Sequence, residues 1–282
     1  FTEHDNQIAI KHFKYAIEQQ PEAAAHYSGL AEAYLFGYWF YGKDGSWLVK
    51  GRINALKAIS LNKNLAWAHK SLGLANYLNH QYALSLSALN RARELEPNWG
   101  EIDAYLALTQ MALNRYPEAH QLAVSAIEKD PANPLTKAVF AKSFRETQRF
   151  SAARNKFEEL MEQAPDFPLS RLFYGEFHLS QQQPQKAREI LQELLVDAPN
   201  FQQAHWLLGN SWLMEKDKDR AISAFERAAI LGGVSTLSAK VYLAVLSNNS
   251  ELQTKLDEEL IGRVDQNIQW SELNLLQGML QL

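Results

Sequence analysis

The chain has 282 residues, of which 46% are hydrophobic, enough to bury the core of one or two domains. Its 28 Lys and Arg and 32 Asp and Glu residues give a net charge of −4 and are interleaved, so no basic face predicts binding to nucleic acid or to anionic lipid. Without cysteine the chain can form neither a disulfide nor a thiolate metal site, and no apolar run reaches the roughly 18 residues of a membrane span.

Residues 1–21 are predicted to form one amphipathic helix that ends at Pro21. Ala9, Phe13 and Ala16 recur at the spacing of the second helix of each repeat described below. We therefore expect the chain to open on the second helix of a truncated repeat and to be a piece of a longer protein.

The stretch GYWFYGKDGSW, residues 37–47, has the spacing of the phosphate-binding motif G-x-x-x-x-G-K-[ST]. Asp44 stands where the motif needs a Ser or Thr hydroxyl for magnesium, and four aromatic residues would crowd a backbone that has to wrap around phosphate. The preceding AEAYLF does not read as a strand. The sequence therefore predicts no nucleotide site and no other cofactor.

From residue 63 onward the chain repeats with a period of about 34 residues. The period is marked at helix-to-helix corners by Lys63, Pro97, Pro131, Pro165, Pro199 and Gly233. Each corner follows one amphipathic segment and opens another, which predicts two helices per repeat. Small residues recur twelve positions before the corner (Ala119, Ala153, Ala187, Ala221) and ten positions after it (Gly73, Ala107, Ala141, Gly175, Gly209). We expect them to be buried where helices cross.

This pattern resembles the tetratricopeptide repeat (TPR). The resemblance implies an all-α, right-handed α-solenoid of about seven repeats. We expect a single solenoid over residues 1–282, divided into 1–21 (half a repeat), 22–63 (a repeat with eight extra residues), 64–233 (five regular repeats), 234–267 (a divergent repeat) and 268–282 (a terminal helix).

The first eighty residues resemble more narrowly the TPR region that follows a winged-helix domain in some bacterial transcriptional activators. Residues that carry this resemblance include Ala9, Ile10, Phe13, Tyr27, Gly29, Tyr34, Ala66, His69 and Gly73. The chain departs from that pattern at Lys63, where the family usually has Pro. Similar repeats are also attached to bacterial cyclases and kinases.

The eight extra residues are predicted to form an aromatic loop. Its rings belong to Tyr38, Trp39, Phe40, Tyr41 and Trp47. Two alternatives follow: the rings fold back over the open N-terminal end of the solenoid, or they form a docking loop for a partner, with Tyr38, Trp39, Tyr41 and Trp47 as its contacts.

The TPR resemblance places a peptide- or protein-binding groove on the first helices of the repeats. Its predicted residues are Trp67, Lys70, Tyr77, Leu108, Met111, Lys142, Arg145, Glu176, Trp206 and Asn210. No three successive repeats carry the Lys and Asn set with which some relatives hold an acidic C-terminus. We therefore expect a partner with hydrophobic or aromatic anchors. That partner could also be a second copy of the chain, which would make a homo-oligomer. Trp67 and Trp206 could instead fill gaps between repeats.

The sequence predicts no catalytic residue and no metal site. No motif brings titratable groups together, and His69 and His205, each six residues after a corner, read as helix-start packing. The interpretation is a non-catalytic protein-binding module, either the sensing or oligomerisation region of a bacterial transcriptional regulator or a free-standing scaffold or assembly factor, for example in envelope biogenesis. The sequence does not specify the compartment. We expect a soluble region, cytoplasmic or periplasmic, of a bacterial protein that a membrane anchor could precede.

Overall fold

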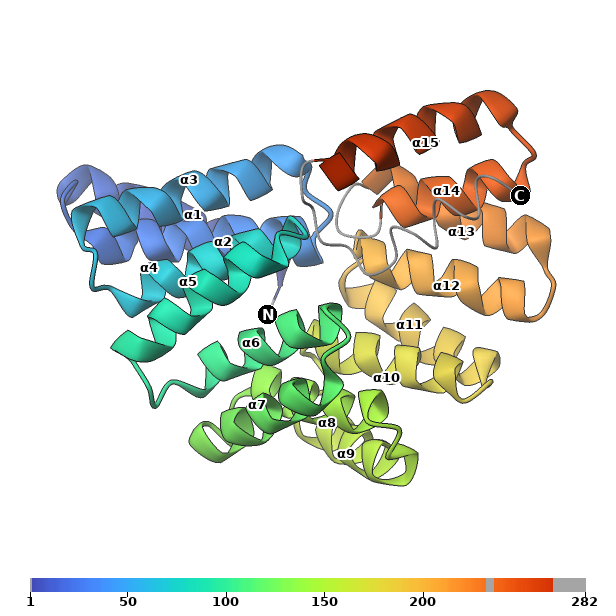
Figure 1. Ribbon diagram of the computed structural model, residues 1–282, viewed down its shortest axis with the longest axis horizontal. Helices are drawn as coiled ribbons and strands as arrows, with labels where there is room; N and C mark the ends of the chain where they lie inside the picture. The colour runs from blue at the N-terminus through green and yellow to red at the C-terminus, as the bar shows by residue number, and fades with distance from the viewer. Residues whose placement is uncertain (1, 232–235, 266–282) are drawn as a thin grey trace.

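A computed structural model describes residues 2–231 and 236–265, which form fifteen α-helices and no strand (Figure 1). The helices are α1 (Glu3–Gln19), α2 (Ala24–Phe40), α3 (Gly45–Leu61), α4 (Ala66–Leu78), α5 (Tyr82–Leu95), α6 (Gly100–Ala112), α7 (Tyr116–Lys129), α8 (Pro134–Glu146), α9 (Phe150–Gln163), α10 (Pro168–Ser180), α11 (Pro184–Asp197), α12 (Gln202–Met214), α13 (Lys218–Leu231), α14 (Thr236–Leu246) and α15 (Ser250–Asp265). The predicted all-α class is confirmed. The expected corner at Gly233 and terminal helix over 268–282 lie outside the described residues.

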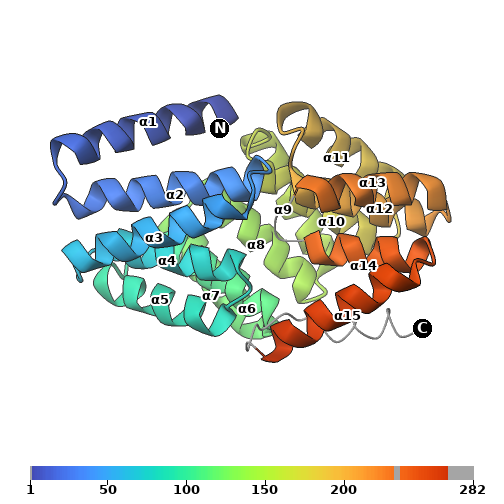
Figure 2. The same ribbon diagram turned by 90° about the horizontal axis from the view of Figure 1, so that it is seen from above.

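The helices pack in consecutive pairs, from α2 with α3 to α14 with α15. From α2 to α12 each even-numbered helix also contacts the next even-numbered one, so these helices form an inner row that the odd-numbered helices cover. In Figure 1 the chain runs from α1–α5 at the left, through α6–α9 at the bottom, to α10–α15 at the right, and Figure 2 shows the same curl from above. The result is a right-handed α-solenoid that turns back on itself.

Small side chains at the helix crossings explain the close packing of each pair. Ala119, Ala153, Ala187 and Ala221 are all fully buried, as their recurrence predicts. Gly73 leaves room for the bulky residue of the second helix, because a Cβ on Gly73 would lie 2.5 Å from Leu89 Cγ. Adding even one methyl group there would force the two helices apart.

Each repeat turns from its first to its second helix through the same backbone conformation. His80, Asn114, Gln148, Gln182 and Lys216 occupy equivalent positions in successive repeats and have φ between 57° and 62°. The N–H of the next residue donates to a carbonyl five residues earlier, at 2.8–3.0 Å. This is the Schellman arrangement that satisfies the last carbonyls of a helix. It was not predicted, because none of the five residues is Gly.

The prediction of an aromatic loop is wrong. The eight extra residues lengthen both helices of the first full pair: α2 and α3 have 17 residues each, whereas α4 has 13 and α5 has 14. Tyr38, Trp39 and Phe40 form the last turn of α2, and Trp47 lies in the first turn of α3. Aromatic side chains do not break helices, so α2 continues until Gly42 turns the chain at φ 59°.

Candidate functional site

The ten predicted groove residues all lie on the inner row of helices. They are Trp67, Lys70 and Tyr77 on α4, Leu108 and Met111 on α6, Lys142 and Arg145 on α8, Glu176 on α10, and Trp206 and Asn210 on α12. Contacts within the chain already engage most of them. The inner surface is therefore less open than the sequence suggests.

Lys70 stands at the centre of a buried charge network that joins three helices. Its Nζ lies 2.7 Å from Glu32 Oε1 of α2 and 2.8 Å from Glu101 Oε2 of α6, and the side chain is 2% exposed. The indole N–H of Trp67 donates to the other oxygen of Glu32 at 2.7 Å. Burial alone would lower the pKa of Lys70, but Glu32 and Glu101 outweigh it and raise that pKa. Lys70 is held as a cation.

A second network joins α8 to α10. Lys142 Nζ lies 2.5 Å from Glu176 Oε2, and Arg145 Nη2 lies 3.0 Å from Glu176 Oε1, so the carboxylate is held from both sides. Both cations also contact Glu146 of α8. Burial alone would raise the pKa of Glu176, but Arg145 and Lys142 outweigh it and lower that pKa to about 2. Each cation of the predicted groove is thus already paired.

The last turn of α2 and the residue that follows it, Tyr38–Tyr41, cross the inside of the solenoid, and we call them the aromatic extension. Their side chains are 2–8% exposed. The Phe40 ring packs edge-on against Phe201 before α12, with centroids 5.6 Å apart, and also contacts Phe167 before α10 at 6.5 Å. Trp39 Nε1 donates to Gln203 Oε1 of α12 at 3.0 Å. The extension therefore links the first complete pair to the fifth and sixth pairs.

For Trp39 this placement differs from both alternatives. Trp39 is buried against α12 on the opposite side of the solenoid, and Tyr38 and Tyr41 are buried as well. Trp47 instead packs edge-on against Tyr34 of the same pair, with centroids 5.2 Å apart. Lys43 lies 2.5 Å from Glu3, so the lysine of the apparent phosphate motif is held by a carboxylate.

The other groove residues divide into buried and partly exposed side chains. Leu108 and Met111 are 2% and 6% exposed and belong to the core. Tyr77 is partly buried, and burial together with the charge of Glu176 raises the pKa of its hydroxyl. Asn210 Nδ2 donates to the Trp206 carbonyl at 3.1 Å, while the Trp206 indole N–H is buried and finds no acceptor in the part of the chain that the structure describes.

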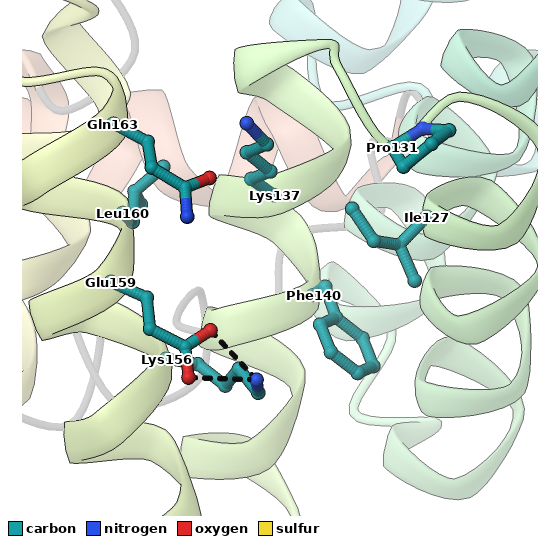
Figure 3. Close-up of a pocket in the computed structure, with 8 residues that line it drawn as sticks. All are labelled: Ile127, Pro131, Lys137, Phe140, Lys156, Glu159, Leu160 and Gln163. Atoms are coloured by element: carbon teal, nitrogen blue, oxygen red, sulfur yellow. Dashed lines mark hydrogen bonds and ion pairs between the residues drawn. The ribbon is translucent and has the colours of Figure 1, made fainter.

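The described part of the chain contains three cavities of note. The first, of about 120 Å³, lies inside the solenoid beside the aromatic extension. The second, of about 200 Å³, opens between α7, α8 and α9, where Figure 3 shows the Lys156–Glu159 ion pair at its edge. The third, of about 340 Å³ and mostly polar, lies between α5, α6 and α7. None of the three was predicted, because cavities depend on how neighbouring pairs pack.

His69 and His205 serve the repeat corners. The Nε2 of each ring lies 2.9 Å from the carbonyl of the residue six positions earlier, Lys63 and Pro199 respectively, as the packing interpretation predicts. Over residues 2–231 and 236–265, no three His, Cys, Asp or Glu side chains gather as they would around a metal ion. The same ranges contain no helix long and apolar enough to cross a membrane.

Known proteins share this architecture. A family model described as tetratricopeptide repeat matches residues 144–210. The chain is 26% identical over 133 residues to the transcriptional regulator HilA of Salmonella typhimurium, a match that covers 46% of this chain and 24% of the regulator, about a quarter of its length.

Two solved structures show the likeness of fold. A human IFIT1 dimer with PPP-AAAA has a TM-score of 0.66 at 16% identity and covers 98% of this chain and 68% of that one. A tetratricopeptide repeat protein from Parabacteroides merdae has a TM-score of 0.63 at 16% identity, covering 87% and 93%. At such identities the likeness is one of fold alone. Residues 144–210 thus belong to the tetratricopeptide-repeat family, and the chain as described has the fold of a TPR solenoid.

Proposed function

We propose that this chain is a non-catalytic TPR module that binds a protein or peptide as the sensing or oligomerisation region of a bacterial transcriptional regulator. The observation that carries the regulator assignment is the 26% identity to HilA over 133 residues. The resemblance of the first eighty residues to the TPR region of winged-helix activators also supports it. Protein binding is the common use of the extended inner surface of such solenoids.

The paired charges of the inner surface indicate what kind of partner it accepts. Lys70 and Arg145 have carboxylates within 3.0 Å, so an acidic C-terminus would have to displace Glu32, Glu101 or Glu176. Removing one partner from a buried ion pair costs about 3–5 kcal/mol. A partner with hydrophobic or aromatic anchors avoids that cost. Trp67, Tyr77 and Trp206, which are partly buried, are the side chains that we assign to its contacts.

The test uses the chromosomal gene, so that the whole protein is present. We expect Trp67→Ala and Trp206→Ala to change the same transcripts as deletion of the gene does, with the protein level unchanged by immunoblot. Tyr15→Ala is the matched control, because Tyr15 is 62% exposed on α1, away from the inner row, and we expect it to behave as wild type.

A partner captured by cross-linking in the same strains should depend on both tryptophans. We expect the yield of capture to change less than about threefold between low and high salt, since apolar contacts are not screened. Unchanged transcripts after gene deletion, together with a defect in envelope assembly, would favour the free-standing scaffold and contradict the regulator assignment.

A further inference from the structure

The cavity inside the solenoid has walls from four separate helix pairs. Phe36, Trp39 and Phe40 of α2 form one wall, and the others come from Glu101 and Tyr105 of α6, Asn133 and Leu135 at the start of α8, and Phe167 and Leu169 at the start of α10. Five of the nine lining side chains are aromatic, and Glu101 is the one carboxylate among them. No lysine or arginine of the described chain lines the cavity.

The charge beside this cavity is not balanced. Lys70 is the one cation between two carboxylates, Glu32 and Glu101, so the buried network carries a net charge of −1 when all three groups are ionised. Burial, together with the charge of Glu32, raises the pKa of the Glu101 carboxyl more than Lys70 lowers it.

Aromatic rings and an under-compensated carboxylate together favour one class of ligand. The faces of aromatic rings attract cations, most strongly where water is excluded, and quaternary ammonium groups are bound in this way. The volume of about 120 Å³ is slightly below the roughly 150 Å³ of a cavity that holds benzene. A trimethylammonium group fits that size, whereas a nucleotide or a sugar does not.

We infer that this cavity binds the alkylated ammonium group of a small organic cation of the choline type, with Glu101 as its counter-charge. The site goes beyond the proposed binding of a protein partner. Because α2 supplies one wall and α8 and α10 supply the opposite one, an occupant contacts both sides of the closed solenoid. The ligand thereby favours the closed arrangement of the solenoid over an open one.

The experiment is calorimetric titration of the purified 282-residue chain with choline and with its neutral isostere 3,3-dimethyl-1-butanol. We expect choline to bind saturably and at least about tenfold more tightly than the isostere, because only the cation gains from the rings and from Glu101. Equal affinities, or no saturable heat for choline, would overturn the inference.

Variants locate the site. Glu101→Gln should weaken choline binding by about tenfold or more. Glu176→Gln is the matched control, since it neutralises another ion-paired carboxylate of the inner row that does not line the cavity, and it should leave the affinity within about twofold.

Leu135→Phe fills the cavity without changing any charge and should abolish choline binding. This variant still tests the inference if Glu101→Gln does not fold. Choline binding that survives Leu135→Phe at full affinity would overturn the inference. None of these titrations involves a protein partner or DNA, so they can fail without affecting the proposed regulator function.

Discussion

At the level of single residues, ion pairs join the inner helices, and one of these pairs follows the period of the chain. Lys142 and Glu176 occupy equivalent positions in two successive repeats and carry opposite charges. That spacing was a signal in the sequence from which their pairing could have been predicted. The pairing of Lys70 with Glu101, which are not at equivalent positions, carries no such signal, because it depends on how far α4 and α6 are rotated against each other.

Glu176 makes stability depend on pH in a defined direction. Its pKa in the folded chain is about 2, against an ordinary value of 4.5, so its contribution is present above about pH 4.5 and is lost as the pH falls toward 2. We expect Glu176→Gln to lower the free energy of unfolding at neutral pH by roughly 2–3 kcal/mol. The free energy of unfolding of this variant should also decline less steeply than that of wild type as the pH falls. Urea unfolding at a series of pH values measures both effects.

A matched control for this prediction is Glu159→Gln on α9. Glu159 also pairs with a lysine, but its side chain is 52% exposed, so water screens the pair. We expect its unfolding curves to run parallel to those of wild type at every pH. If the Glu176→Gln curves also stay parallel to wild type, the assigned pKa of Glu176 is wrong.

At the level of helices, the sequence predicted the regular pairs well because their spacing is local. The repeat period, the corner prolines and the small residues at crossings can each be read from one repeat and its neighbour. The end of α2 was mispredicted for the opposite reason. Whether YWFY continues a helix or leaves it depends on a place for the rings, and Phe167 and Phe201 supply that place from far along the chain.

The turns within repeats predict that a glycine substitution stabilises the chain at Gln148 but destabilises it at Gln121. Gln148 has φ 59°, a conformation that costs a non-glycine residue about 1 kcal/mol, so Gln148→Gly should raise the free energy of unfolding by up to roughly 1 kcal/mol. Gln121, exposed within α7, is the control, and Gln121→Gly should lower it by about the same amount. Chemical denaturation of both variants decides this, and a loss of stability in Gln148→Gly would contradict the assigned turn.

At the level of the whole molecule, the decisive feature is closure by the aromatic extension. A solenoid of this kind is ordinarily stabilised by contacts between neighbouring repeats alone. Here Phe40, 2% exposed, packs between the first and the later pairs. Closure could not be predicted from the repeat pattern, because it depends on the pitch of the solenoid. That pitch is the sum of small rotations between successive helix pairs.

Removing the Phe40 ring should open the solenoid. We expect Phe40→Ala to lower the free energy of unfolding by about 3–5 kcal/mol and to increase the radius of gyration in small-angle X-ray scattering, with helicity retained. Phe150→Ala on α9 is the control, since that ring is 39% exposed and its loss should change neither quantity appreciably. An unchanged scattering profile for Phe40→Ala would show that the extension does not hold the two sides together.

The hydrogen bond from Trp39 to Gln203 joins residues 164 positions apart in a chain whose other contacts are mostly local. Contacts of such long sequence separation form late in folding, because the intervening chain must first be ordered. An open TPR array can fray from its ends, one repeat after another, whereas here loosening α2 also deprives α10 and α12 of buried partners. The first and sixth pairs should therefore open together as a single cooperative unit. Amide hydrogen exchange should then give similar opening free energies for both pairs.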